Sequence, residues 1–199
     1  VAYVRWLQAR GNVSTTVTSC VRDLMEAIRV MEPASDQCLI RELIVTLHAR
    51  QAPTRNKHTR IIHPDTVLKG ALTYLDNIAD LDVRGEYSRA GKFRDALVIA
   101  ILACRPIRLA NITGIVIGEH LLEEDGRWRC AFGGHETKDK RPLAFALPER
   151  LVPYLETYLE GYRPVLLKGR TDQCLWISSR GTPMSEQAVY WNTCRLTEE

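Results

Sequence analysis

The feature that most constrains the fold is a nine-residue apolar run, from Ala96 to Cys104, with no polar face. A helix that is apolar on every side has to be covered by other elements all round. We therefore expect a helix from about Phe93 to Cys104 at the centre of a core. The run is far shorter than the roughly 20 residues that span a bilayer, and no signal-peptide pattern precedes the first helix. These features predict a cytoplasmic protein without a membrane partner.

The periodicity changes after this helix. Three short segments, Ile115–Leu122, Trp128–Phe132 and Leu143–Leu147, are strand-like. They are separated by Glu123–Gly126 and by Gly133-Gly134 with a charged turn, which is typical of antiparallel pairing. The chain is thus predicted to be mainly α with a small antiparallel β-sheet, an α+β arrangement.

An N-terminal helical bundle is predicted before this part. Residues 2–10 form a first helix, Ser14 or Thr15 caps a second, and Ser35 caps a third. Further helices are expected to begin at His63-Pro64, at Pro148 and at Ser185. The predicted organisation is a helical domain over residues 1–50, a basic linker over 51–63 and a second domain over 64–199. Because the chain begins at Val1 and stops within a helical pattern, we expect a piece of a longer protein.

Positive charge is concentrated near the N-terminus. Residues 1–63 hold nine Lys/Arg against five Asp/Glu, although the whole chain carries only +3. The stretch from Arg50 to His63 contains Arg50, Arg55, Lys57 and Arg60 and no acid. Two interpretations are open: a solvated linker, or a strap that follows DNA phosphates.

Six cysteines, at positions 20, 38, 104, 130, 174 and 194, include no CxxC pair. This scatter favours reduced thiols over a disulfide framework or a zinc site. His135, Glu136 and Cys130 match no common metal-ligand spacing, so no metal is expected.

Two isolated cations are the candidate chemistry. Arg108 follows the apolar helix among apolar neighbours, so we expect a largely buried guanidinium, and Lys138 lies in a tight turn about thirty residues later. Two cations delivered in this way suit a shared anion, most often a phosphate. Arg105 carries a similar charge and is an alternative to Arg108. A structural arginine and an ordinary solubilising turn are the competing interpretations.

The order of these motifs resembles the catalytic domain of the tyrosine recombinases, the phage-integrase family, over roughly residues 64–199. The family's Gly-Leu-Arg-x-x-Glu-Leu pattern is matched at Arg108, but Pro106 and Ile107 precede it and Asn111 replaces the glutamate. Thr137-Lys138 followed by a strand ending at Leu147-Pro148 matches a second motif. Three further segments resemble the family: Arg94-Asp95, Cys174–Ile177 and the turn Gly181–Ser185.

The resemblance implies roles for these residues. Arg108 would hold the non-bridging oxygens of the scissile phosphate, and Lys138 would protonate the leaving 5′ oxygen. Arg50, Arg55, Lys57, Arg60, Lys140 and Arg141 would contact double-stranded DNA. The family implies a core-binding domain over residues 1–50, a tetramer on DNA for the full-length protein, and no metal or other cofactor.

Two elements of the family's active site are missing from the sequence. No His-x-x-Arg occurs after any of the five histidines, and Tyr154, Tyr158, Tyr162 and Tyr190 all precede the place of that box. The family's nucleophilic tyrosine, which forms the 3′-phosphotyrosine link, therefore has no counterpart here. We predict that the chain alone does not cleave DNA. The alternatives are a non-catalytic DNA-binding module or regulator with the same fold, and a purely structural helical domain.

Overall fold

The computed structural model describes residues 2–51, 61–82 and 85–197. The chain divides into two compact units, Val1–Ile61 and Ile62–Glu199, each described by itself. Within the described residues, no helix is both long enough and apolar enough to cross a membrane.

The first unit contains α1 (Ala2–Ala9), α2 (Ser14–Met31) and α3 (Cys38–Ala49). Its core is small: Val4, Leu7, Val17 and Val21 are buried, and the apolar side chains of α3 that pack on them are only partly buried. The two predicted caps are wrong. Helix α2 begins at Ser14 itself, and the Ser35 hydroxyl donates to the carbonyl of Glu32 (2.8 Å), which leaves Gln37 as the residue before α3.

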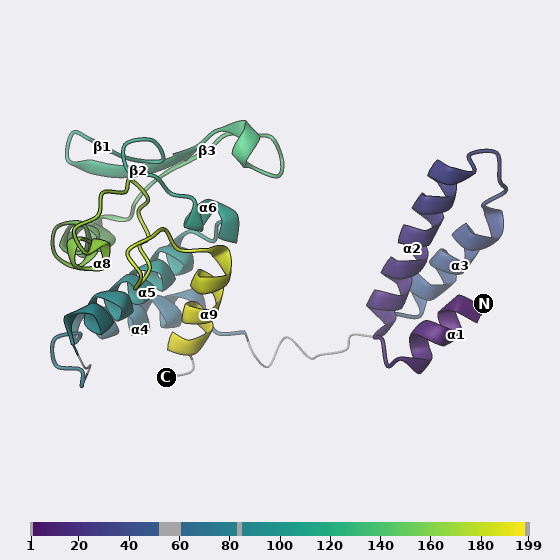
Figure 1. Ribbon diagram of the computed structural model, residues 1–199, viewed down its shortest axis with the longest axis horizontal. Helices are drawn as coiled ribbons and strands as arrows, with labels where there is room; N and C mark the ends of the chain where they lie inside the picture. The colour runs from purple at the N-terminus through teal and green to yellow at the C-terminus, as the bar shows by residue number, and fades with distance from the viewer. Residues whose placement is uncertain (1, 52–60, 83–84, 198–199) are drawn as a thin grey trace. The chain divides into compact units, whose positions relative to one another are not determined.

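The second unit is organised around α5 (Glu86–Cys104), in which every residue from Phe93 to Ile101 is buried. Figure 1 shows α4 (Pro64–Asp76) on one side of α5 and the sheet on the other. The predicted central helix is therefore confirmed, but it begins seven residues before Phe93. In this earlier part Glu86 to Ser88 are exposed but Ala90 is fully buried, and the charge of Glu86 in the first turn favours the helix N-terminus.

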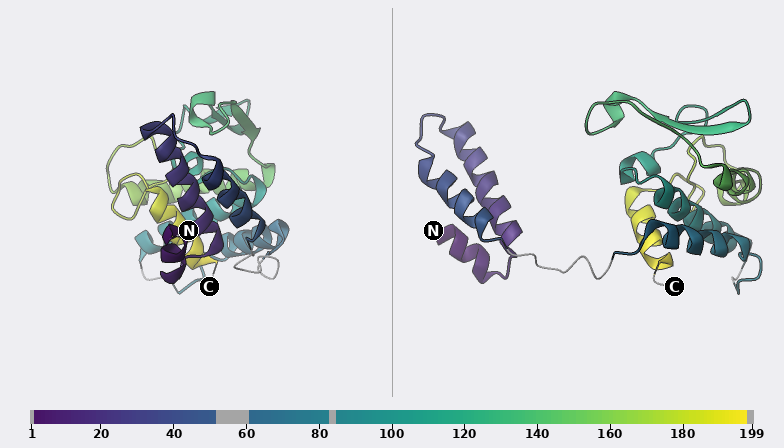
Figure 2. Two further views of the ribbon diagram at one scale, coloured as in Figure 1. Left: turned by 90° about the vertical axis from the view of Figure 1, so that its right-hand side faces the viewer. Right: turned by 180° about the vertical axis from the view of Figure 1, so that it is seen from behind.

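Short helices complete this unit and pack around α5. They are α6 (Leu109–Thr113), α7 (Val152–Thr157), a π-helical segment (Tyr158–Tyr162), α8 (Arg163–Leu167) and α9 (Glu186–Leu196). The predicted cap of the last helix is confirmed, since the Ser185 hydroxyl accepts a hydrogen bond from the N–H of Ala188 (3.2 Å). Figure 2 shows the same arrangement of this unit from behind.

The sheet is three-stranded and antiparallel, in the order β1 (Leu121–Glu124), β2 (Arg127–Phe132) and β3 (Leu143–Ala146). The mainly α fold with one small antiparallel sheet is thus confirmed. Asp125 and Gly126, both with positive φ, form the tight turn between β1 and β2. The first predicted strand, Ile115–Leu122, is misplaced. Its first half bridges to the segment around Cys174, where Leu175 N–H donates to the Ile115 carbonyl.

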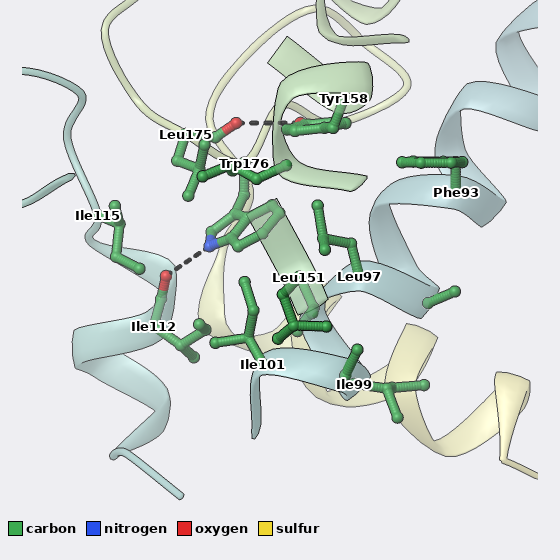
Figure 3. Packing of buried hydrophobic residues seen from close by; sticks show 14 of the residues in the cluster. Phe93, Leu97, Ile99, Ile101, Ile112, Ile115, Leu151, Tyr158, Leu175 and Trp176 are labelled. Carbon is green, nitrogen blue, oxygen red and sulfur yellow. Dashed lines mark hydrogen bonds between the residues drawn. The ribbon is translucent and has the colours of Figure 1, made fainter. Parts of the chain in front are cut away.

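Trp176 lies at the centre of the core of the second unit and is fully buried. Its indole N–H donates to the carbonyl of Ile112 (2.7 Å), and the Tyr158 hydroxyl donates to that of Leu175 (3.0 Å) (Figure 3). The segment from Leu175 to Ile177 is therefore tied to both α6 and the π-helical segment. This anchors the C-terminal part of α6, the short helix that follows Arg108 directly.

One charged pair lies inside this core. The Arg94 guanidinium donates twice to the Asp95 carboxylate (2.9 and 2.7 Å) and once to the carbonyl of Ile177. The two side chains are only 4% and 7% exposed, and Asn192 of α9 donates to the same carboxylate oxygen. Burial raises the pKa of the Asp95 carboxyl, and the Arg94 guanidinium opposes that shift. The pair links α5, the Trp176 segment and α9.

We predict that Asp95→Asn lowers the free energy of unfolding of the second unit by about 3 kcal/mol, because it leaves the Arg94 charge buried without its counter-ion. Denaturant unfolding followed by circular dichroism measures this. The control is Glu124→Gln, which breaks an exposed pair with Arg129 and should change stability by less than about 0.5 kcal/mol. Equal effects of the two variants would contradict the structural role of the buried pair.

Candidate phosphate-binding site

Arg108 lies directly before α6, at the point where the chain leaves the buried helix α5. Its side chain is 49% exposed, so the prediction of a buried guanidinium is wrong. The buried arginine is Arg94. The reason is that α5 ends at Cys104, and the segment through Pro106 carries the chain out of the core before Arg108 is reached.

Lys138 is exposed on the connection between β2 and β3, which is an ordered turn. The turn begins with a 3₁₀ helix, Gly134–Glu136, and the buried Thr137 then donates its hydroxyl to the carbonyls of Gly134 (3.2 Å) and Arg141 (2.6 Å). Gly134 approaches the backbone of Lys140 so closely that a Cβ would lie 2.8 Å from the Lys140 carbonyl oxygen. The backbone beside Lys138 is therefore fixed by its own hydrogen bonds.

Two contacts bring Arg108 and the Lys138 turn together. Arg108 Nη2 lies 3.1 Å from Asp139 Oδ1, and the buried Asn111 donates its amide to the carbonyl of Glu136 (3.2 Å). Figure 1 shows α6 beside the turn that joins β2 to β3. Residues about thirty positions apart in the sequence thus lie on adjoining segments, one with Arg108 and one with Lys138. Asn111, which stands where the family has a glutamate, thus makes a neutral hydrogen bond to the Lys138 turn.

Glu136 joins three parts of the site. Its carboxylate accepts from the N–H of Gly133 (2.6 Å) and lies 2.6 Å from His120 Nε2. His120 Nδ1 accepts from the N–H of Val116 (3.2 Å), so the proton is on Nε2, and this nitrogen donates to Glu136. The Gly133 N–H, and then His120, lower the pKa of the Glu136 carboxyl. The ionised carboxylate is therefore the form that holds the turn.

A groove of about 530 Å³ opens beside Arg108. It is lined by Arg105, Pro106, Ile107, Arg108, Asn111, Leu143 and Phe145. Both arginines that the sequence left as alternatives face the same hollow. The lining thus combines two arginines with apolar residues from the Pro106 segment and from β3.

Within the described residues, the other predicted site residues make no hydrogen bond or ion pair with Arg108 or Asn111. Lys140 and Arg141 are exposed on the same turn as Lys138, and Arg50 is exposed at the end of α3 in the first unit. Arg55, Lys57 and Arg60 lie outside the described residues. Sequence reasoning missed Glu136 and His120 as residues of this site, although the three-residue spacing between Gly133 and Glu136 is that of a helix-capping pair.

Two of the tyrosines in the C-terminal part are engaged within the fold. Tyr158 is fully buried and its pKa is raised to about 12 by burial, and the Tyr154 hydroxyl donates to Asp76. Residues 2–51, 61–82 and 85–197 contain no cluster of three His, Cys, Asp or Glu side chains that could hold a metal ion. The site is therefore described by its cations and by the hydrogen bonds that position them.

We predict a pH-dependent effect of Glu136→Gln on stability. Because the pKa of Glu136 is lowered on folding, its ionised form stabilises the fold fully above the ordinary value near 4.5, and this contribution is lost as the pH falls through the lower folded value. At pH 7 the variant should lose at most about 1 kcal/mol, since the side chain is partly exposed. The loss should vanish in strong acid.

Unfolding measured in a pH series compares the two proteins, with Glu119→Gln as the control, an exposed carboxyl whose side chain has no hydrogen bond or ion pair among the described residues. A difference between wild type and Glu136→Gln that stays constant with pH would refute the role of the charge.

Known proteins of similar sequence include tyrosine recombinases. No protein-family profile matches the chain. Over 116 residues, 58% of its length, the chain is 24% identical to the tyrosine recombinase XerD of Staphylococcus aureus and to that of Staphylococcus epidermidis. It spans 37% of the length of those proteins. This similarity confirms the relationship that the motif order predicted: the chain is related to the tyrosine recombinase family.

Proposed function

We propose that the chain is the part of a site-specific tyrosine recombinase that grips DNA and presents two cations to one phosphodiester. The observation that carries this proposal is the pair of contacts, Arg108 with Asp139 and Asn111 with Glu136, that sets the Arg108 segment against the Lys138 turn. Two cations held against one exposed site favour a polyanion. The relatives carry the name of an enzyme that recombines DNA, which supports the same ligand.

The proposed chemistry follows from the two side chains. Arg108 offers a planar fork of donors for the non-bridging oxygens, where negative charge grows during phosphoryl transfer. Lys138 offers a proton to the 5′ oxygen as it leaves. In the parent enzyme a tyrosine would attack the phosphorus and keep the strand as a 3′-phosphotyrosine, and strand exchange would follow within a tetramer on DNA. No metal or nucleotide cofactor is part of this proposal.

A second function is favoured by the sequence itself, which holds no His-x-x-Arg. The chain alone would then bind DNA without cutting it, as a DNA-holding module or a regulator does. Under the first proposal, residues 1–50 would be the core-binding domain, 51–63 a basic linker and 64–199 the N-terminal part of the catalytic domain. The boundary between the two compact units, at Ile61 and Ile62, falls within that linker. Location beside the bacterial or phage chromosome follows from the same proposal.

Binding of a mixed-sequence duplex in a salt series tests the function. We predict an affinity that falls steeply with salt, and a logarithmic slope that becomes shallower by about 0.9 in Arg108→Ala and in Lys138→Ala. The triple variant of Arg55, Lys57 and Arg60 to alanine tests whether that segment contributes. Arg127→Ala, an exposed arginine at the other hairpin turn, is the control and should leave the slope unchanged. No binding by the folded wild type at low salt would refute the proposal.

The same duplex should yield no covalent adduct with the wild-type chain. The test uses a duplex with a nick close to the cleavage position. After cleavage, the short strand between the cut and the nick would dissociate, so the strand could not be rejoined and the covalent adduct would be trapped. A covalent protein–DNA species would refute the second function and show that a nucleophile lies within these 199 residues.

The Asp139 carboxylate forms an ion pair with Arg108, and under the proposed function a DNA phosphate has to displace it. We predict that Asp139→Asn binds the duplex about threefold more tightly, since an exposed ion pair of this kind contributes little and is easily exchanged. The control is Asp125→Asn, which removes the same charge from the turn between β1 and β2 and suits the positive φ there. Equal gains in both variants would mean that only net charge matters.

A further inference from the structure

Arg105 differs from Arg108 in what it contacts. Its side chain is exposed and makes no hydrogen bond or ion pair with any residue in the described ranges, whereas Arg108 is paired with Asp139. The two arginines are separated by two residues of non-helical chain, so their Cα atoms lie at most about 10 Å apart. Arg105 is therefore an available cation beside the proposed phosphate site.

The opposite wall of the groove is apolar for a reason that lies in the sheet. Leu143 and Phe145 pair across the strands with Phe132 and Cys130, which are buried, so all four side chains point to the core-facing side. Because β3 is an edge strand, this side is incompletely covered there. Leu143 is 37% exposed, whereas its partner Phe132 is only 4% exposed.

The combination of an available cation and an apolar wall matches the chemistry of a nucleotide. A deoxyribose presents aliphatic C–H surface between two phosphates, and a groove of about 530 Å³ is within the range of about 300–1,000 Å³ for small-molecule sites. An extended peptide could instead pair with the edge of β3. The groove lining, with two arginines and no acid, favours the polyanion.

We propose that this groove, between residues 105–111 and β3, is a second subsite for the DNA backbone: Arg105 binds the phosphate next to the one at Arg108, and Leu143 and Phe145 pack on the deoxyribose between them. The proposal rests on the proposed DNA-binding function and deepens it. It assigns separate phosphates to Arg105 and Arg108.

The test uses the full chain and the salt series on a mixed-sequence duplex. Arg105→Ala should make the logarithmic salt slope shallower by about 0.9, and the double variant with Arg108→Ala by about 1.8, because each arginine neutralises its own phosphate. If the two arginines shared one phosphate, the double variant would have the slope of a single variant, and the proposal would be wrong. Arg127→Ala again serves as the control.

The apolar wall is tested by placing the same charge on the two faces of β3. Leu143→Asp should weaken binding by at least about threefold, because the carboxylate would face the backbone phosphates. Ala144→Asp, one residue further on the exposed face of the strand, should have a smaller effect. Leu143→Asn, which has the same size without the charge, separates repulsion from any loss of folding.

Binding by the wild type distinguishes failure of the subsite from failure of the DNA-binding function. If the wild type binds and Arg108→Ala flattens the slope, but Arg105→Ala and Leu143→Asp bind like the wild type, the subsite is refuted and the DNA-binding function stands. The groove would then be open to a peptide strand. If the folded wild type shows no salt-dependent binding, the proposed function fails, and the subsite fails with it.

Discussion

The second unit depends on the burial of α5 on all sides. A helix without a polar face cannot remain at a surface, so α4, α7, α8, α9 and the sheet each gain stability by covering part of it. The one polar feature of this buried stretch is the pair Arg94 and Asp95, and it is matched by partners from the Trp176 segment and α9. Apolar contact supplies the stability, and the buried pair restricts how the covering segments can be placed.

The candidate site lies at the end of that helix because burial ends there. Cys104 is the last residue of α5, and the next four residues bring the chain from the core to the surface. Arg105 and Arg108 are thus exposed but lie between two segments held by the core, α5 before them and α6 after them, where Trp176 donates to the Ile112 carbonyl. Such a position suits a residue that has to meet a phosphate with defined geometry.

The sequence was informative where a single segment determines the outcome. The apolar run predicted α5, and the turn residues after β1 predicted a hairpin, because these signals are local. Ile115–Ile117 looked like a strand for the same reason, but this segment bridges to residues 173–175 instead of β2. The choice between two pairing partners is a tertiary competition that β-branched composition does not decide.

In the candidate site, too, local motifs were predictable from the sequence and tertiary contacts were not. Arg108 and Lys138 were found from motif order, and they do lie on adjoining segments, although the expected burial of Arg108 was wrong because the exit of the chain from the core depends on Pro106 and its surroundings. Glu136 and His120 were missed as positioning residues. Their link joins residues 16 apart through one side-chain contact, which leaves no periodic pattern in the sequence.

Two kinds of contact hold the Arg108 segment to the Lys138 turn, and they respond differently to an incoming phosphate. The bond from Asn111 to the Glu136 carbonyl is neutral and partly buried, so neither salt nor a ligand competes strongly for it. The contact between Arg108 and Asp139 is exposed and ionic, and a phosphate can replace the carboxylate with equal or better geometry. The neutral bond therefore holds the two segments together, while the ionic contact orients Arg108 and would be the one that a phosphate replaces under the proposed function. Under the proposed function, the exchange of a carboxylate for a DNA phosphate would break only the exposed ionic contact and would leave the neutral bond in place.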